Sequence, residues 1–172
     1  MSSEVMVSIC CITYNHEKYI RDTLEGFLNQ ETNFKFEILI HDDASTDNTA
    51  SIIKEYEKNY PDIIKAIYQT ENQYSKNIKI TAEFLFPIAK GKYIAMCEGD
   101  DFWIDKNKLQ TQVDFLENNK DFSLCVHGST TIDEKTQKRG QIRGYKENTV
   151  LGLKKFLKDY YNNKIVLFQT SS

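Results

Sequence analysis

The chain has 172 residues, of which 40% are hydrophobic and 27% charged, and its 22 basic and 25 acidic side chains give a formal net charge of −3. This length suffices for one well-buried core and is too short for two domains of ordinary size. The composition argues against intrinsic disorder, and no segment has the roughly 20 consecutive apolar residues that a membrane-spanning helix requires. The sequence therefore predicts a single soluble globular domain over residues 1–172.

The small net charge conceals an uneven distribution. Residues 135–164 carry nine basic and two acidic side chains, which leaves 13 basic and 23 acidic side chains in the rest of the chain. A basic surface near the C-terminus is suited to phosphate, an anionic lipid or an acidic acceptor, although the same pattern is found on the solvated face of a helix. Peripheral contact with a membrane is thus one of two interpretations of this segment.

Cysteine usage indicates a reducing compartment. The four cysteines lie in apolar segments without C-x-x-C pairing, and no secretion signal precedes them. They are Cys10, Cys11, Cys97 and Cys125. We expect reduced thiols in the core of a cytoplasmic protein, with neither a disulfide framework nor a thiolate metal site.

The N-terminal third alternates between strand and helix patterns. Residues 5–13 are apolar and rich in β-branched side chains, which is typical of a strand buried on both faces of a parallel sheet. Residues 18–29 have apolar side chains at helical spacing, so we expect a helix that packs on that sheet. A second strand is predicted over residues 36–41.

The acidic segment after the second strand leads into another helix. Ser45 or Asp47 can cap this helix by accepting its free backbone N–H groups, and Pro61 closes it. Its apolar stripe consists of Ile52, Ile53, Tyr56 and Tyr60.

The same alternation continues through the middle of the chain. A third strand is predicted over residues 63–69 and a fourth over residues 92–97. The helix between them, residues 78–89, should end or kink at Pro87, and Gly91 can supply its left-handed C-terminal cap.

Weaker patterns follow in the C-terminal third. A helix is marked by Leu109, Val113 and Leu116. Beyond it we expect a strand over residues 123–133, a turn or hairpin over 134–144, an amphipathic helix over 153–161 and a last strand from residue 165. Because the chain stops shortly after that strand pattern and lacks a closing helix, we expect it to be part of a longer protein.

Strands that alternate with helices predict an α/β fold with a doubly wound, mostly parallel sheet flanked by helices. In such sheets, ligands bind at the carboxyl ends of the strands. Three polar pairs follow predicted strands: Tyr14 with Asn15, Asp42 with Asp43, and Asp100 with Asp101.

The acidic segment after the fourth strand suggests a metal site. Glu98, Asp100 and Asp101 surround a glycine, and like charges this close repel unless a cation neutralises them. Mg²⁺ or Mn²⁺ suits oxygen ligands and usually takes one or two protein carboxylates, with water and substrate phosphate completing the shell. The sequence therefore predicts a site in which the ion bridges these carboxylates and the diphosphate of a substrate. The alternative is an acidic turn that caps the helix after Trp103.

The other two pairs suggest a nucleotide. Asp42 or Asp43 can accept the N–H of a nucleobase or a ribose hydroxyl, although an Asx turn is the alternative. Tyr14 can stack on a base, with Asn15 hydrogen-bonded to it, although an isolated tyrosine after a strand is more often part of the core or of a turn.

Several common sites are absent from the sequence. It contains no P-loop, no dinucleotide-binding glycine motif and no G-x-S-x-G motif. The histidines His16, His41 and His127 show no i, i+4 pairing, so metal ligation by histidine is not indicated. His41 adjoins the aspartate pair and can hydrogen-bond to it.

Three segments in order, residues 7–30, 36–49 and 89–103, resemble the family 2 glycosyltransferases of the GT-A fold. The resemblance extends from about residue 7 to residue 119, and more weakly through SLCVHG. It implies an enzyme that transfers a sugar from a nucleotide-diphosphate donor, at family level a UDP-sugar, to a saccharide or lipid-linked acceptor with inversion. The usual setting is polysaccharide assembly for the bacterial cell surface, in the cytoplasm or at the inner face of the membrane, with no nucleic acid partner.

The resemblance also implies roles for individual residues. Tyr14 packs on the base, and Asp43, with Asp42 beside it, binds the base. Asp100 contacts the ribose or the donor sugar, and Asp101 holds Mn²⁺ or Mg²⁺ on the diphosphate. The remaining residues expected in the donor site are Thr13, Asn15, Glu17 and Glu98, the last standing where many members have the first Asp of an Asp-x-Asp-Asp run.

Two features depart from the family pattern. The catalytic base of the family comes from an acidic motif further along, so we expect it beyond Ser172, with the acceptor-binding part. Many members also carry an Arg-Asn pair where this chain has Ala82 and Glu83, and Lys76 or Lys79 is the candidate for the missing positive charge.

Two alternatives therefore stay open. One is a non-catalytic nucleotide-sugar-binding module that lacks the base. The other is a phosphoryl-accepting signalling domain in which Asp42 and Asp43, together with an Asp near the end of a later strand, hold Mg²⁺.

Overall fold

The structure is a computed structural model and describes residues 4–140, 152, 154, 155, 157 and 158. The chain divides into two compact units, with the boundary between Asn118 and Asn119. Each unit is described by itself, and the single domain over residues 1–172 stays a prediction.

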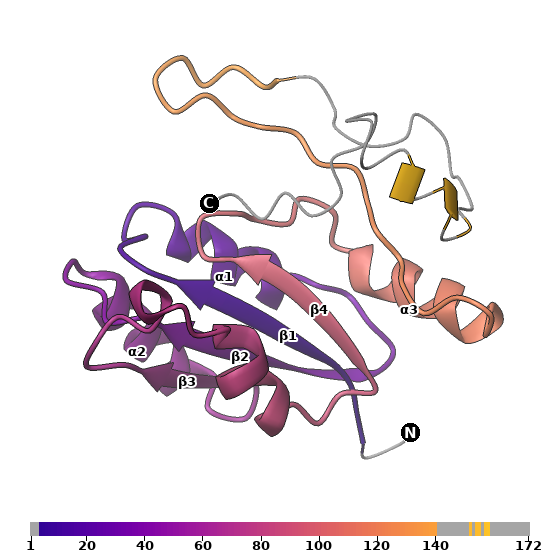
Figure 1. Cartoon of the computed structure of the whole chain (residues 1–172), viewed down its shortest axis with the longest axis horizontal. Helices are drawn as coiled ribbons and strands as arrows, with labels where there is room; N and C mark the ends of the chain where they lie inside the picture. The colour runs from indigo at the N-terminus through magenta and orange to yellow at the C-terminus, as the bar shows by residue number, and fades with distance from the viewer. Residues whose placement is uncertain (1–3, 141–151, 153, 156, 159–172) are drawn as a thin grey trace. The chain divides into compact units, whose positions relative to one another are not determined.

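A four-stranded parallel sheet forms the centre of the first unit (Figure 1). Its strands are β1 (Val5–Thr13), β2 (Lys35–Asp42), β3 (Ile64–Tyr68) and β4 (Tyr93–Glu98). Their spatial order is β3-β2-β1-β4, so the chain moves outward from β1 to β3 and then returns to the other side of β1. The order reverses between β1 and β4, and this is the point where doubly wound sheets bind their ligands.

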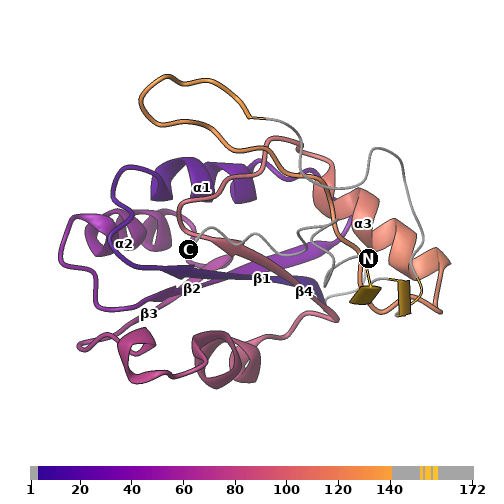
Figure 2. The same ribbon diagram turned by 45° about the horizontal axis from the view of Figure 1, so that its top comes forward.

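Helices cover one face of the sheet and short helical turns lie on the other (Figure 2). The helices are α1 (Ile20–Leu28), α2 (Thr49–Asn59) and α3 (Lys108–Asn118). The turns are η1 (Tyr74–Lys76), η2 (Thr81–Leu85) and η3 (Phe86–Ile88). The predicted fold class is confirmed.

The alternation of side chains along β1 explains why both of its faces are buried. Ile9 and Cys11 point into the larger core beneath the helices, where Leu24 and Phe27 of α1 pack against them. Cys10 points to the opposite face and meets Leu85 of η2. The apolar run of β1 is therefore that of a central strand, as predicted.

The predicted helix over residues 78–89 is broken into two turns. Asn77 has a left-handed φ of 59°, and the following backbone forms a π-helical turn and then a 3₁₀ turn that contains Pro87. A proline has no N–H and its ring clashes with the carbonyl four residues earlier, so a regular helix cannot run through this position.

Gly91 does not cap this segment in the left-handed conformation, and that prediction is wrong. The cap residue is Ala89, with extended backbone (φ −66°, ψ 131°). The space around Gly91 explains the glycine instead, because a Cβ there would lie 2.3 Å from the backbone nitrogen of Ser8. Gly91 allows the chain to enter β4 in close contact with β1.

The strand predicted over residues 123–133 is also wrong. The described part of this segment forms no continuous strand, and an isolated antiparallel bridge joins Ile132 to Arg139, which agrees with the predicted hairpin as far as residue 140. The preference of such residues for strands depends on packing against neighbouring side chains. Leu124 and Val126 are 52% and 45% exposed, so little of this packing is present.

Three of the four cysteines are buried, as predicted, whereas Cys125 is only partly buried. The helix predicted over 153–161 and the strand predicted from residue 165 lie outside the described residues. Within the described residues, no helix is long and apolar enough to cross a membrane.

Candidate functional site

The carboxyl ends of β1, β2 and β4 bring the three predicted polar pairs to one edge of the sheet. Thr13 pairs with Asp42 across β1 and β2, and Ile12 pairs with Glu98 across β1 and β4. The backbone continues this pairing past the strands, because the Asp43 N–H donates to the Thr13 carbonyl over 2.9 Å. The sequence clusters are therefore neighbours in space, as parallel strands require.

Asn15 joins the loop after β1 to the loop after β2. Its backbone N–H donates to Ser45 Oγ over 2.9 Å, and its Oδ1 accepts the N–H of Thr46 over 2.7 Å. Asn15 and Ala44 both adopt left-handed backbone conformations, with φ of 57° and 66°. The Asn15 side chain, predicted to line the donor site, thus holds the loops after β1 and β2 together.

Glu17 makes a second connection between these loops. Its Oε2 accepts hydrogen bonds from both nitrogens of Asn48 over 2.9 Å, and its N–H donates to Asp47 Oδ2 over 3.1 Å. The N-cap residue of α2 is Asn48, and Asp47, one position earlier, accepts one of the free N–H groups of the helix, that of its first residue Thr49, whereas Ser45 accepts none of them. Although partial burial opposes ionisation, hydrogen bonds from Thr49 and Glu17 lower the pKa of Asp47.

Asp42 is 2% exposed and forms an Asx turn. Its Oδ1 accepts the hydroxyl of Ser45, and its Oδ2 accepts the Ser45 N–H over 3.3 Å. This is the structural alternative that the sequence left open for Asp42.

Asp43 is 1% exposed and binds a different segment. Its Oδ1 and Oδ2 accept the backbone N–H groups of Gln73 and Tyr74 over 2.7 and 3.0 Å, and its carbonyl accepts Asn72 Nδ2 over 3.2 Å. By contrast, the side chain of Tyr14 is open, with 43% of its surface exposed at the end of β1. Thr13, just before it, is buried.

His16 is a site residue that the sequence reasoning missed. Its Nδ1 lies 3.2 Å from Thr13 Oγ1 and its Nε2 lies 3.8 Å from Asp100 Oδ2, so the ring stands between the ends of β1 and β4. Its backbone is held by the Thr49 hydroxyl, which accepts its N–H over 2.8 Å. The position of His16 directly after the Tyr14–Asn15 pair was the signal available in the sequence.

Gly99 is what lets the β4 loop approach this ring. A Cβ on Gly99 would lie 2.5 Å from Thr13 Oγ1 and 3.0 Å from His16 Nδ1. The Gly99 carbonyl accepts the buried Thr23 hydroxyl over 3.0 Å, which ties the loop to α1. Glycine therefore serves close packing at this position.

The acidic loop after β4 creates a negative environment. The Asp101 N–H donates to the Glu98 carbonyl over 3.2 Å and closes a turn. Burial, together with the neighbouring Asp101 carboxylate, raises the pKa of the Cys97 thiol to about 12. Burial also raises the pKa of Cys11, with Cys97, Glu98 and Asp100 adding to it.

The acidic loop fits a divalent ion only in part. The described residues contain no group of three or more His, Cys, Asp or Glu side chains arranged to hold a metal. One or two carboxylates with a substrate diphosphate are nevertheless a sufficient ligand set for Mg²⁺ or Mn²⁺. The metal role of Asp101 stays a prediction.

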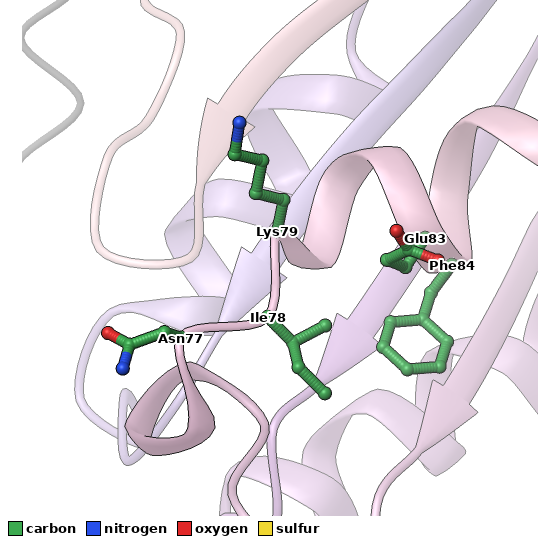
Figure 3. Close-up of a pocket in the computed structure, with 5 residues that line it drawn as sticks. All are labelled: Asn77, Ile78, Lys79, Glu83 and Phe84. Atoms are coloured by element: carbon green, nitrogen blue, oxygen red, sulfur yellow. The ribbon is translucent and has the colours of Figure 1, made fainter.

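A pocket of about 380 Å³ lies beside η2 (Figure 3). It is lined by Asn77, Ile78, Lys79, Glu83 and Phe84. In Figure 3 the Lys79 side chain extends away from the ring of Phe84. Lys76 instead forms an ion pair with Glu71, so Lys79 is the better placed of the two lysines considered for the missing positive charge.

His41 does not bond to the aspartate pair. Its Nε2 lies 3.1 Å from Gln69 Nε2, and its ring packs on Phe84 with centroids 4.9 Å apart. Its buried Nδ1 has no hydrogen-bond partner among the described residues. Burial lowers the pKa of His41 even though Asp43 and Asp42 oppose this effect.

Solved structures share this architecture. Staphylococcus aureus TarS (residues 1–349), in its complex with UDP, has 26% sequence identity and a TM-score of 0.53 over 67% of this chain and 33% of its own. The mannosyltransferase PcManGT from Pyrobaculum calidifontis, in complex with GDP-Man and Mn²⁺, matches with a TM-score of 0.56 and 24% identity over the same shares. The chain has the predicted GT-A fold.

Curated relatives match the same part of the chain. An uncharacterised protein of Mycobacterium tuberculosis (strain ATCC 25618 / H37Rv) is 42% identical over 130 residues, which is 74% of this chain and 36% of the relative. The Escherichia coli UDP-Glc:alpha-D-GlcNAc-diphosphoundecaprenol beta-1,3-glucosyltransferase WfaP is 37% identical over 117 residues, 68% of this chain and 43% of its own. The chain thus spans less than half the length of either relative.

The sequence profile described as Glycosyl transferase family 2 matches residues 8–171. This match covers both units of the chain and includes every residue of the site described above. The chain belongs to glycosyl transferase family 2.

Proposed function

We propose that this chain is the donor-binding part of a glycosyltransferase that uses a UDP-sugar. The observation that carries the proposal is the meeting of Tyr14, Asp43 and the Asp100–Asp101 pair at one edge of the sheet, where the strand order reverses. A nucleotide-sugar needs an aromatic surface for its base and charged groups for its diphosphate. The UDP complex of TarS and the UDP-glucose named for WfaP support the choice of uridine.

The base and ribose ends of the donor have separate partners. The open ring of Tyr14 stacks on the base, and the Asp43 carboxylate accepts a base N–H. Asn15 and Glu17 hold the two loops that carry these groups. Asp100 contacts the ribose or the donor sugar, and His16 lies beside its carboxylate.

The diphosphate requires positive charge. Asp101 would hold a divalent ion, and that ion, when bound, neutralises the negative charge that grows on the leaving diphosphate. Lys79, which lines the pocket beside η2, supplies a further positive charge. Among oxygen ligands of this type, Mn²⁺ and Mg²⁺ are the ions that fit.

The reaction proposed is inverting transfer to a saccharide or lipid-linked acceptor. It requires a carboxylate to deprotonate the acceptor hydroxyl, and we propose that this base lies beyond residue 172. The lipid-linked acceptor in the name of WfaP supports this acceptor class, and we propose a location at the cytoplasmic face of a membrane. The signalling alternative is disfavoured because the oxygens of Asp42 and Asp43 already accept hydrogen bonds from Ser45, Gln73 and Tyr74.

The test is a titration of UDP, GDP and ADP with and without Mn²⁺, followed by the fluorescence of Trp103, the sole tryptophan. Trp103 packs on Phe27 with ring centroids 4.7 Å apart and follows Asp101 by two residues. A movement of the acidic loop should therefore change the surroundings and the fluorescence of Trp103. We expect a metal-dependent response to UDP that Asp101→Ala abolishes.

The matched control is Asp62→Ala. Asp62 is exposed and precedes β3, at the opposite edge of the sheet, so this variant should respond like the parent. Equal, metal-dependent UDP affinity of Asp101→Ala and the parent would show that the metal assignment is wrong.

A further inference from the structure

Residues 72–77, which we call the 72–77 turn, are attached to the end of the sheet through one residue, Asp43, which directly follows β2. Among the described residues, every hydrogen bond that joins this turn to the sheet ends at Asp43. The two shortest of these run from the backbone N–H groups of Gln73 and Tyr74 to the two carboxylate oxygens, over 2.7 and 3.0 Å. Hydrogen bonds to an ionised carboxylate are stronger than those between neutral groups.

The turn is otherwise a self-contained unit. Asn72 Oδ1 accepts the Ser75 N–H over 2.8 Å, and the Asn77 N–H donates to the Tyr74 carbonyl over 2.9 Å. Its helical segment η1 has no buried residue, and the Tyr74 side chain is 75% exposed. Little apolar surface therefore holds the turn in place, and the Asp43 carboxylate is its main attachment.

The same carboxylate is the group that we assign to the nucleobase. Asp43 is 1% exposed because the turn covers it, so a base cannot reach the oxygens while both N–H groups remain bound. We propose that the 72–77 turn is a latch, and that a nucleobase N–H opens it by replacing the backbone N–H of Gln73 or Tyr74 on Asp43. This inference rests on the proposed function.

The chemistry of the exchange restricts the ligand. Uracil and guanine carry a ring N–H that a carboxylate accepts, whereas the corresponding ring nitrogen of adenine presents a lone pair that a carboxylate repels. Opening the latch also displaces a wall of the pocket beside η2, since Asn77 belongs to both the turn and the pocket. Binding of the base at Asp43 would thus move Asn77 and change the pocket in which Lys79 lies.

The first test follows individual backbone amides by hydrogen exchange, detected by NMR on the full chain. Saturating UDP with Mg²⁺, which is diamagnetic and leaves the amide signals sharp, should speed the exchange of the Gln73 and Tyr74 amides by about tenfold or more, because they lose a charge-assisted bond. The Gln69 amide, which donates to the Asp42 carbonyl over 2.9 Å at the same edge, should not change and serves as the control. Saturation with UDP while both amides keep their protection would overturn the latch.

The second test removes one donor of the latch and keeps the carboxylate. Gln73 has a φ of −81°, which proline tolerates, and its N–H bonds only to Asp43. Gln73→Pro should bind UDP about tenfold more tightly, because one bond less must be broken. Gln73→Ala keeps the N–H and should bind like the parent.

The two tests separate this inference from the proposed function. If the parent binds no nucleotide, the proposed function is wrong and the latch with it. If the parent binds UDP but Gln73→Pro binds it equally or less tightly than Gln73→Ala, the latch alone is wrong. A gain in affinity cannot come from general damage to the fold.

Discussion

Single residues in the site are selected for space as well as for charge. Gly99 adjoins Thr13 and His16 so closely that no side chain fits, and Ala44 holds a left-handed conformation that an L-residue adopts only at a cost. We therefore expect opposite changes in stability when Gly99 is enlarged and when Ala44 is replaced by glycine. Both changes can be measured without knowledge of the substrate.

The substitution Gly99→Ala should destabilise the protein by about 1–3 kcal/mol and weaken UDP binding, because the new Cβ overlaps Thr13 Oγ1 and displaces the acidic loop. Urea unfolding and the Trp103 titration measure the two effects. Gly152→Ala is the matched control, since no atom of the described residues lies within 4 Å of where its Cβ would be. If the two variants are equally stable, the close approach at Gly99 is not a constraint.

The substitution Ala44→Gly should stabilise the protein by about 0.5–1 kcal/mol, because glycine adopts a φ of 66° without steric cost. Ala50→Gly, in the first turn of α2, should have the opposite sign and cost about 0.5–1 kcal/mol. Paired urea denaturation curves give both values. A loss of stability in Ala44→Gly would contradict the strain argument.

At the scale of elements, α2 and the loop after β1 stabilise one another through Asp47. This carboxylate accepts the N–H of Thr49 at the start of α2 and the N–H of Glu17 from the other loop. Ionised Asp47 is therefore favoured in the folded protein, and its pKa lies below the ordinary value of 3.8.

This lowered pKa gives a pH dependence with a definite sign. The stabilisation by Asp47 is complete above pH 3.8, where the carboxylate is ionised in the unfolded chain too, and is lost as the pH falls through the lower folded value. Asp47→Asn should therefore lose less stability than the parent between pH 4 and about pH 2, as urea midpoints would show. Asp62→Asn, at an exposed position, should follow the parent curve.

The elements that could be predicted are those with a strong local signal. The bounds of β1 were predicted correctly, because a short apolar segment rich in β-branched residues is typical of a buried strand. Residues 78–89 were predicted as one helix, since their apolar periodicity does not reveal the left-handed Asn77 just before them or the break into two helical turns. The prediction of a strand over residues 123–133 was wrong because β propensity alone does not supply a neighbouring strand to pair with.

The candidate site was predictable in position but not in its internal bonds. Strand-end pairs identified Tyr14, Asp43 and Asp100, because a parallel sheet brings such ends together. The sequence could not show that Asp43 holds Gln73 and Tyr74, since that contact joins segments 30 or more residues apart.

At the scale of the whole molecule, the central position of β1 has a consequence for folding. Val7 of β1 pairs with Tyr93 of β4. The pairing of β1, the first of the four strands to be synthesised, therefore cannot be completed until β4 has been synthesised. Contacts so distant in sequence slow folding, and domains of this kind complete their sheets late during synthesis. Because the acidic loop follows β4, a nascent chain can form the end of β1 and β2 that we propose binds the base well before it can complete the loop that we propose binds the diphosphate.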